Sequence, residues 1–189
     1  VYRGVRRCAE FLSAKVGIHS PDLVPYRMQA VSLAAALFDK EYADIEQQLE
    51  DWFWLTTYCE AFGSSARQSE IAMQNLTDYL RSGEFKWTLK QLPRIRSLGD
   101  LRIDFRSVRV KALALALARR QDGPMPGTAS RHLSVHGFEA FCQIPFDPSN
   151  RGRAAYRFVL HPTEIADFRG RGAHGHPTEP ELAAHFLTQ

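Results

Sequence analysis

The stretch over residues 51–80, DWFWLTTYCEAFGSSARQSEIAMQNLTDYL, constrains the fold of this chain more than any other segment. In both halves, apolar and aromatic residues recur at the spacing of successive helical turns, which predicts two helices with buried faces. Gly63 suits the left-handed position that follows a helix, and Ser64 or Ser65 suits the N-cap of the next one. The stretch therefore predicts a tight helical hairpin, ended by Gly83, at the centre of a helical core.

Further helices are predicted on both sides of this hairpin. In the first of them, Val5 and Cys8 are expected to face inward and Arg7 to face solvent or a partner. Pro25 suits the first turn of the second helix, because its missing N–H would have no partner there in any case. The alanine-rich helix that follows the hairpin carries basic residues at both ends. Together the helical patterns cover approximately residues 2–15, 25–38, 42–62, 66–81 and 105–120.

The chain changes character at the segment QDGPMPGTAS, which concentrates Gly, Pro and small polar residues. We expect a helical bundle domain over residues 1–121, a linker over 122–130 and a small α+β tail over 131–189. Within the tail, a short helix is predicted around 129–141 and a strand around 156–161. The expected fold class is mainly α: a bundle of about five helices, followed by this tail.

Composition narrows the functional classes. A chain of 189 residues with 44% hydrophobic content can bury a substantial core, and its formal net charge of +3 is modest. The chain has three cysteines, an odd number, and they are far apart: Cys8, Cys59 and Cys142. This argues against a disulfide framework and against a zinc site. It favours a location in the reducing cytoplasm. No apolar run reaches the roughly 18–20 residues of a membrane span, so no membrane partner is expected. The start at Val1, inside a predicted helix, suggests a fragment of a longer polypeptide.

Basic residues concentrate between residues 90 and 120, where nine Lys and Arg face only Asp100 and Asp104. Arginine forks bind phosphate oxygens in pairs, so this cluster favours contact with duplex DNA. A solvated face that pairs with acids elsewhere would show the same composition, and no groove-reading motif is present. The candidate nucleic-acid-binding residues are Arg94, Arg96, Arg102, Arg106, Arg109, Lys111, Arg151, Arg153 and Arg157.

Six of the seven histidines follow residue 131, which raises the question of a metal or catalytic site. Neither an H-E-x-x-H motif nor Cys/His ligand spacing occurs among them. Surface or packing roles are therefore expected for most, and no metal site is predicted. The histidines kept as catalytic candidates are His132, His136 and His161.

Three stretches resemble a known family: PDLVPYRMQAVSLAAALF, DWFWLTTYCEAFGSSARQSEIAMQNL and FRSVRVKALALALARR. They are similar to the C-terminal half of GmrSD-type proteins, bacterial restriction and phage-defence proteins that join a ParB-like N-terminal domain to an HNH-nuclease-like C-terminal one. The resemblance implies a ββα-metal nuclease centre in the tail, where a histidine activates water and a divalent cation stabilises the phosphoryl transition state.

The tail departs from that family's motif at the residues that carry the chemistry. The corresponding positions read FCQIPF at residues 141–146 and Tyr156-Arg157, so the general base and the asparagine are missing. Cys142 and Gln143 are poor replacements, because an amide is not a base and a thiol prefers softer metals than Mg²⁺. Cys142, Gln143 and Tyr156 are thus degenerate motif positions, and the resemblance implies an HNH-like tail without its own nuclease centre.

Three functions remain open from the sequence. The first is a C-terminal DNA-binding or regulatory module of a bacterial restriction or anti-phage protein, with duplex DNA as partner and no cofactor. The second is an active HNH-type nuclease that uses relocated ligands and Mg²⁺ or Mn²⁺. The third is a docking module for the missing N-terminal NTPase or nuclease domain of the same polypeptide, or for another subunit of an oligomer.

Overall fold

The computed structural model describes residues 2–38, 40, 42–63, 65–85, 104, 106–123, 127–137, 140–143 and 157–159. Over these residues the chain is mainly helical, as predicted, and it forms two compact units. None of the described helices is long and apolar enough to cross a membrane. The predicted domain boundaries at 121 and 131 stay predictions, because most of the tail lies outside the described residues. Unit 1 comprises Val1–Val16 and Val24–Arg96, and unit 2 comprises Gly17–Leu23 and Ser97–Gln189.

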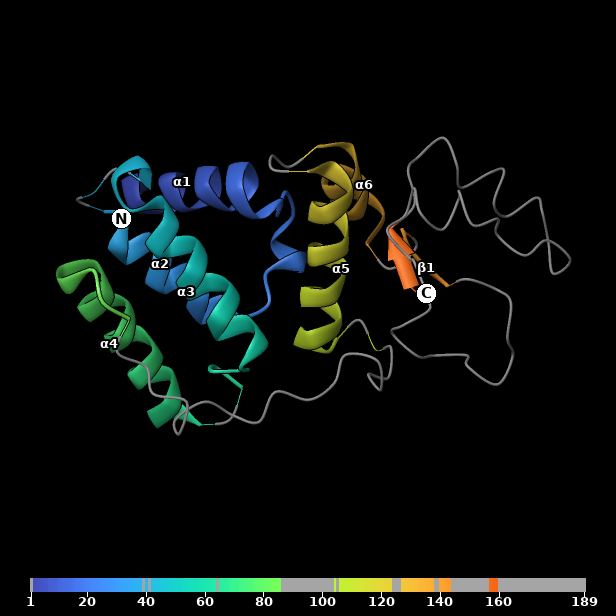
Figure 1. Cartoon of the computed structure of the whole chain (residues 1–189). Helices are drawn as coiled ribbons and strands as arrows, with labels where there is room; N and C mark the ends of the chain where they lie inside the picture. The colour runs from blue at the N-terminus through green and yellow to red at the C-terminus, as the bar shows by residue number, and fades with distance from the viewer. Residues whose placement is uncertain are drawn as a thin grey trace, which may run out of the picture. The chain divides into compact units, whose positions relative to one another are not determined.

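The regular elements in the described part of unit 1 are all helical (Figure 1). A π-helical segment, Leu12–Val16, extends its first helix, and a 3-10 turn, Tyr42–Asp44, precedes the third. The four helices predicted before residue 82 are confirmed, with ends that differ by a few residues. They are α1 (Tyr2–Phe11), α2 (Arg27–Ala36), α3 (Glu46–Tyr58) and α4 (Ala66–Ser82).

Gly4 determines which face of α1 packs against α2. A Cβ atom on Gly4 would stand 2.2 Å from the carbonyl oxygen of Ala34, so only glycine allows the two backbones to come this close. This contact turns Cys8 and Phe11 into the core and leaves Val5 53% exposed. The prediction for Cys8 is confirmed and that for Val5 is wrong, because the apolar periodicity takes no account of a glycine as the contact residue.

Arg7 is buried within unit 1 instead of facing solvent or a partner, so the sequence prediction for it is wrong. Its guanidinium group donates hydrogen bonds to the carbonyl oxygens of Leu37, at 3.3 Å, and Lys40, at 3.0 Å. Leu37 is the C-cap residue of α2, where carbonyl groups lack partners within the helix. The arginine therefore satisfies backbone acceptors at the end of a neighbouring helix.

The predicted hairpin of α3 and α4 is confirmed. Trp52 is fully buried in α3, and its indole N–H donates to the carbonyl oxygen of Ala72 in α4 at 3.0 Å. At the start of α4, the Ser65 hydroxyl accepts a hydrogen bond from the backbone N–H of Gln68, as expected of an N-cap residue. Gly83 ends α4 in the left-handed conformation, with φ of 71°.

The corner of the hairpin differs from the prediction. Helix α3 ends at Tyr58, and the left-handed residue that follows it is Glu60, with φ of 52°, rather than Gly63. A Cβ atom on Gly63 would stand 2.8 Å from the hydroxyl oxygen at the end of the Tyr26 side chain. Pro25 likewise lies before the N-cap residue Tyr26 and outside α2, so its predicted place in the first turn is wrong.

A buried amide joins α2 to α3. The side-chain NH₂ group of Gln29 lies 3.2 Å from the Phe53 carbonyl oxygen and 2.8 Å from the hydroxyl oxygens of both Thr56 and Thr57. All three polar side chains are almost fully buried. The core of unit 1 therefore contains a polar contact, which the apolar pattern of the sequence does not reveal.

Unit 2 combines two helices with a pair of short strands over its described part (Figure 1). Helix α5 packs against α6 and β2, and it buries mainly alanine side chains. The strands pair antiparallel, with Gln143 opposite Arg157 and Cys142 opposite Phe158. The predicted helix near residue 129 is confirmed but is shorter than expected. The elements are α5 (Val108–Asp122), α6 (Thr128–His136), β1 (Phe141–Gln143) and β2 (Arg157–Val159).

Candidate nucleic-acid interface

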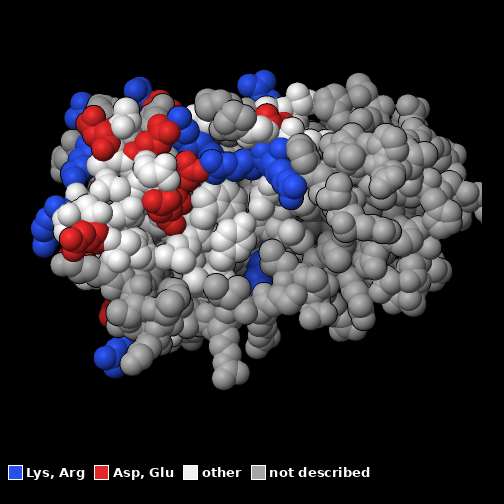
Figure 2. Space-filling view, in the orientation of Figure 1, with Lys and Arg blue, Asp and Glu red and all other residues white. Residues whose placement is uncertain are grey.

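The described basic residues are divided unequally between the two units. The described part of unit 2 holds seven Lys and Arg against three Asp and no Glu, whereas that of unit 1 holds eight against nine Asp and Glu. On the face shown in Figure 2, basic side chains lie beside acidic ones over much of the coloured surface. The described part of unit 2 therefore has a net positive charge. The formal net charge of the whole chain does not reveal this, because it sums over both units.

Arg106 and Arg109 lie at the start of α5. The side chain of Arg106 is 94% exposed, and its Nε atom lies 3.4 Å from a carboxylate oxygen of Asp104, itself exposed. The same carboxylate oxygen accepts the backbone N–H of Arg106 at 2.9 Å. Because exposed ion pairs contribute little free energy, this contact leaves Arg106 able to exchange its partner for a phosphate. Arg109 follows, half-buried, in the first turn of the helix.

Lys111 has a different position and role. At about 100° per residue it lies roughly opposite Arg109 on the helix. Its ammonium group donates a hydrogen bond to the carbonyl oxygen of Asp22. Lys111 thus connects α5 to the segment Gly17–Leu23 of the same unit, and a structural role explains its charge.

Arg120, which was not among the candidates, shares a face with Arg109. Arg120 is eleven positions further along the chain, so the two lie within about 20° of each other around the helix and about 16 Å apart along it. Arg120 is exposed, in the last turn of α5. In the sequence, its three-turn spacing from Arg109 indicates that the two share a helix face. A count of basic residues along the chain does not consider this spacing.

The other predicted basic residues are not brought into this arrangement by the described part of the structure. Arg157 belongs to β2, where only its backbone is described. The remaining candidates lie outside the described residues: Arg94, Arg96, Arg102, Arg151 and Arg153.

Asp122, in the last turn of α5, holds the start of α6. One carboxylate oxygen accepts the backbone N–H of Ala129 at 2.8 Å, and the other accepts the N–H of Ser130 at 2.8 Å and its hydroxyl at 2.6 Å. Partial burial by itself would raise the pKa of Asp122. Hydrogen bonds from the Ser130 hydroxyl and from the backbone N–H groups of Gly127, Ser130 and Ala129 outweigh that effect, and the pKa is lowered. The sequence gives no local signal for this contact, because the capping residue belongs to the preceding helix.

His19 lies against α6 in the same unit, and its backbone N–H donates to the Ser134 hydroxyl oxygen at 3.1 Å. Burial lowers the pKa of His19, the positive charge of Arg131 lowers it further, and the negative charge of Asp122 opposes both. Together these effects favour the neutral imidazole over the charged one. His19 was not a candidate, since it is isolated in the sequence from the other histidines.

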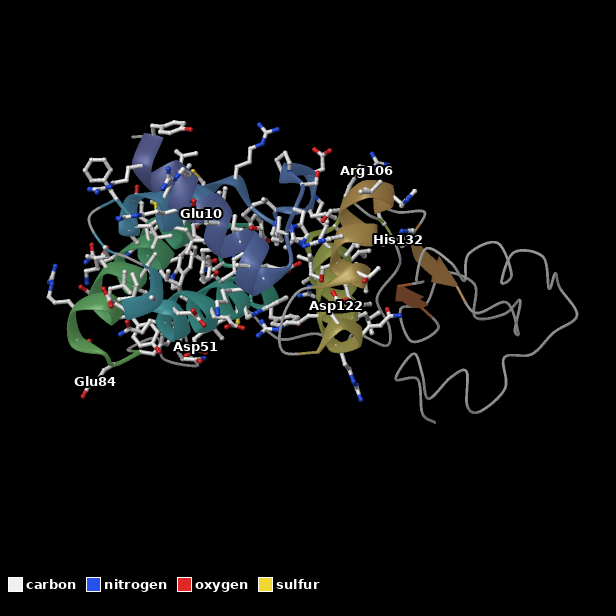
Figure 3. All side chains as sticks on the ribbon, turned by 90° about the horizontal axis from the view of Figure 1, so that it is seen from above. Glu10, Asp51, Glu84, Arg106, Asp122 and His132 are labelled. Carbon is white, nitrogen blue, oxygen red and sulfur yellow. The ribbon has the colours of Figure 1, made fainter. Side chains whose placement is uncertain are left out.

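Two of the three candidate catalytic histidines, His132 and His136, lie on α6. Figure 3 labels the first of them on this helix. The rings of His132 and His136 have centroids 4.4 Å apart and are inclined at 45°. His132 is buried and His136 is exposed. His161 lies outside the described residues. Within the part of the chain that the structure describes, no group of three or more His, Cys, Asp or Glu side chains could hold a metal ion.

The positions predicted to form a degenerate motif lie partly on the strand pair. Cys142 and Gln143 belong to β1, and Arg157 stands opposite Gln143 on β2. Tyr156 lies outside the described residues. The two segments that the family resemblance relates to one nuclease centre are thus adjacent in space at the level of the backbone.

Unit 1 has an apolar groove between α2 and α4. Its volume is about 500 Å³. Val31 and Met73 lie on its walls, and Val31 is 56% exposed although it is aliphatic. Lys40 and Arg81 add two cations to the lining, and the Lys40 ammonium group donates to the Leu80 carbonyl oxygen at 3.4 Å. Such a surface can receive an apolar side chain from another polypeptide.

Taken together, the described residues define a mainly helical protein with two compact units, one near neutral and one basic over its described part. The small antiparallel strand pair belongs to the basic unit. No family model, no curated protein and no solved structure matches this chain.

Proposed function

We propose that this chain is the C-terminal DNA-binding or regulatory module of a bacterial restriction or anti-phage defence protein, without nuclease activity of its own, that acts in the cytoplasm. The observation that carries the proposal is the basic charge around α5, in particular the exposed Arg106 before the helix and Arg120 in its last turn. The resemblance to GmrSD-type proteins supports the biological setting.

Phosphate contact is the chemistry that this arrangement favours. Arg106 and Arg109 stand at the N-terminus of α5, where the helix dipole also attracts an anion. Arg109 and Arg120, about 16 Å apart on one face, could reach phosphates on a single stretch of duplex. Contacts of this kind fix position on DNA without selecting a sequence, so the binding should depend on salt and little on base composition.

The degenerate tail is the second part of the proposal. An antiparallel strand pair that carries Cys142 and Gln143 on one strand and Arg157 on the other is compatible with the first two strands of a ββα fold. With a thiol and an amide where the family has its histidines, the strand pair would keep the scaffold and lose the base. We propose that the tail helps to hold DNA or a partner instead of cleaving it.

Charge reversal tests the DNA contact. Binding of a fluorescein-labelled duplex is measured by anisotropy for the wild type and for the double variant Arg106→Glu/Arg109→Glu, which should bind more weakly at low salt. The matched control is Arg67→Glu, an exposed residue in the first turn of α4. All three substitutions place an acid near a helix N-terminus, where it does not harm the helix. Equal loss in the control, or no loss in the double variant, would refute a specific role for α5.

The groove between α2 and α4 favours a second function, docking of a polypeptide that carries an N-terminal domain of the GmrSD type. Val31→Glu would place a charge on the apolar wall of the groove and should abolish co-purification with that polypeptide. Val135→Glu, at a position that is 77% exposed on α6, is the matched control. If both variants co-purify as well as the wild type, the groove is not the docking surface.

A further inference from the structure

His132 and His136 lie on successive turns of α6, and their imidazole rings are close to each other. Residues four apart in a helix lie on one face, about 5–6 Å apart at Cβ, and here the ring centroids are 4.4 Å apart. Metal-binding helices with the H-E-x-x-H pattern use the same four-residue spacing to direct two imidazoles at one ion. The pair thus has the spacing of a two-histidine ligand set.

We infer that His132 and His136 form a binding site for a borderline divalent transition-metal ion such as Zn²⁺ or Cu²⁺. This inference is independent of the proposed DNA binding, and it differs from the nuclease hypothesis in its choice of metal. Imidazole nitrogen suits zinc, copper and nickel, whereas Mg²⁺ requires oxygen ligands. Two protein ligands leave coordination positions for water, so the site would be open rather than structural.

The surroundings of the pair suit a cation. The C-terminal turn of α6 contains His136, and the negative end of a helix dipole stabilises positive charge there. His132 is only 4% exposed, so packing restricts its ring before any ion binds, while the exposed His136 leaves access for the ion and its waters. Arg131, the preceding residue, opposes a cation, but it is exposed and its charge is screened by solvent.

A bound ion would clamp the last two turns of α6 together. The first turn is already held by Asp122, through its hydrogen bonds to Ala129 and Ser130. Both ends of this nine-residue helix would then be fixed by contacts that do not depend on helix propensity. Metal binding should therefore stabilise unit 2 in proportion to the logarithm of the free ion concentration above its dissociation constant.

The test is Zn²⁺ binding by isothermal titration calorimetry on the whole chain, with Cu²⁺ binding followed by electron paramagnetic resonance. His136→Ala is the principal variant, because its side chain is exposed and its loss leaves the core intact. Loss of an outer-shell partner alone costs about 10- to 100-fold in metal affinity, so loss of a ligand should weaken the tightest Zn²⁺ site by at least about tenfold. The adjacent Val135→Ala should bind as the wild type does.

The spectrum of the Cu²⁺ complex separates this site from the other histidines of the chain. The wild type should show nitrogen coupling from two imidazoles, and His136→Ala should lose that pattern. Wild-type Zn²⁺ affinity in His136→Ala would overturn the inference. So would a Cu²⁺ spectrum that the substitution leaves unchanged.

Discussion

Replacing Gly4 by alanine sets two physical effects against each other. Alanine is the better helix former, so propensity alone predicts that Gly4→Ala stabilises α1 by about 0.5–1 kcal/mol. The new methyl group, however, would stand 2.2 Å from the Ala34 carbonyl oxygen, a distance at which the backbone of α2 must move. Such overpacking costs about 1–3 kcal/mol. We expect the packing effect to dominate, and the variant to be less stable by about 1–2 kcal/mol.

Urea unfolding followed by tryptophan fluorescence measures this change in the right part of the chain. All three tryptophans lie between residues 52 and 87, which belong to unit 1. The matched control is Val5→Ala on the same helix. Val5 is 53% exposed, so its truncation should change the free energy of unfolding by no more than about 0.5 kcal/mol.

The changes in stability of Gly4→Ala and Val5→Ala show which face of α1 is buried: the one that the sequence pattern predicts or the one that the structure has. If Gly4→Ala raises the stability, α1 and α2 are not in close backbone contact and the account of their packing fails. If Val5→Ala costs more than about 1 kcal/mol, the face of α1 predicted from apolar periodicity is the buried one after all.

Three further changes test other parts of the structure. Asp122→Ala should lower the stability of unit 2 by about 0.5–2 kcal/mol, measured by far-UV circular dichroism. Because folding lowers the pKa of Asp122, this stabilisation is present above its ordinary pKa of 3.8 and is lost as the pH falls through the lower pKa of the folded state. If the stability difference between the wild type and Asp122→Ala grew as the pH fell, the role of the Asp122 carboxylate would be contradicted. Burial raises the pKa of Cys8 to about 11 and also raises the pKa of Cys59. Both thiols should therefore react with a disulfide reagent only after the protein unfolds. Fast labelling of either thiol in the native protein would be inconsistent with its burial. Trp52→Phe removes the buried indole N–H that donates to the Ala72 carbonyl oxygen. It should lower the free energy of unfolding by about 0.5–1.5 kcal/mol for the hydrogen bond, plus a contribution from the cavity. If urea unfolding shows no change in stability, that contact is contradicted.

Local chemistry in the sequence predicts the helices and several of their ends. Ser65 caps α4 and Gly83 ends it, because each effect depends only on residues within one turn. Gly63 does not end α3, because the helix already ends at Tyr58 and the left-handed conformation is taken by Glu60, a residue type that rarely adopts it. The buried face of α1 was not predictable from local sequence, because the contact of Gly4 with α2 is a tertiary one.

The candidate interface was predictable in composition but not in arrangement. A count of charges treats Arg106 and Lys111 as equivalent, yet one is almost fully exposed and the other binds the backbone of Asp22. Arg120 joins the face of Arg109 by helical spacing, which clustering along the sequence does not express. Asp122 was missed because a carboxylate on one helix that caps another leaves no local pattern.

The dependence of DNA affinity on salt tests the central proposal most directly. Phosphate contacts by Arg106, Arg109 and Arg120 alone predict that log Kobs falls with log[salt] with a slope of about −2.7 between about 50 and 200 mM salt. The double variant Arg106→Glu/Arg109→Glu should flatten this slope by about 1.8. No binding to duplex DNA at low ionic strength, or binding whose affinity does not change with salt, would contradict the account.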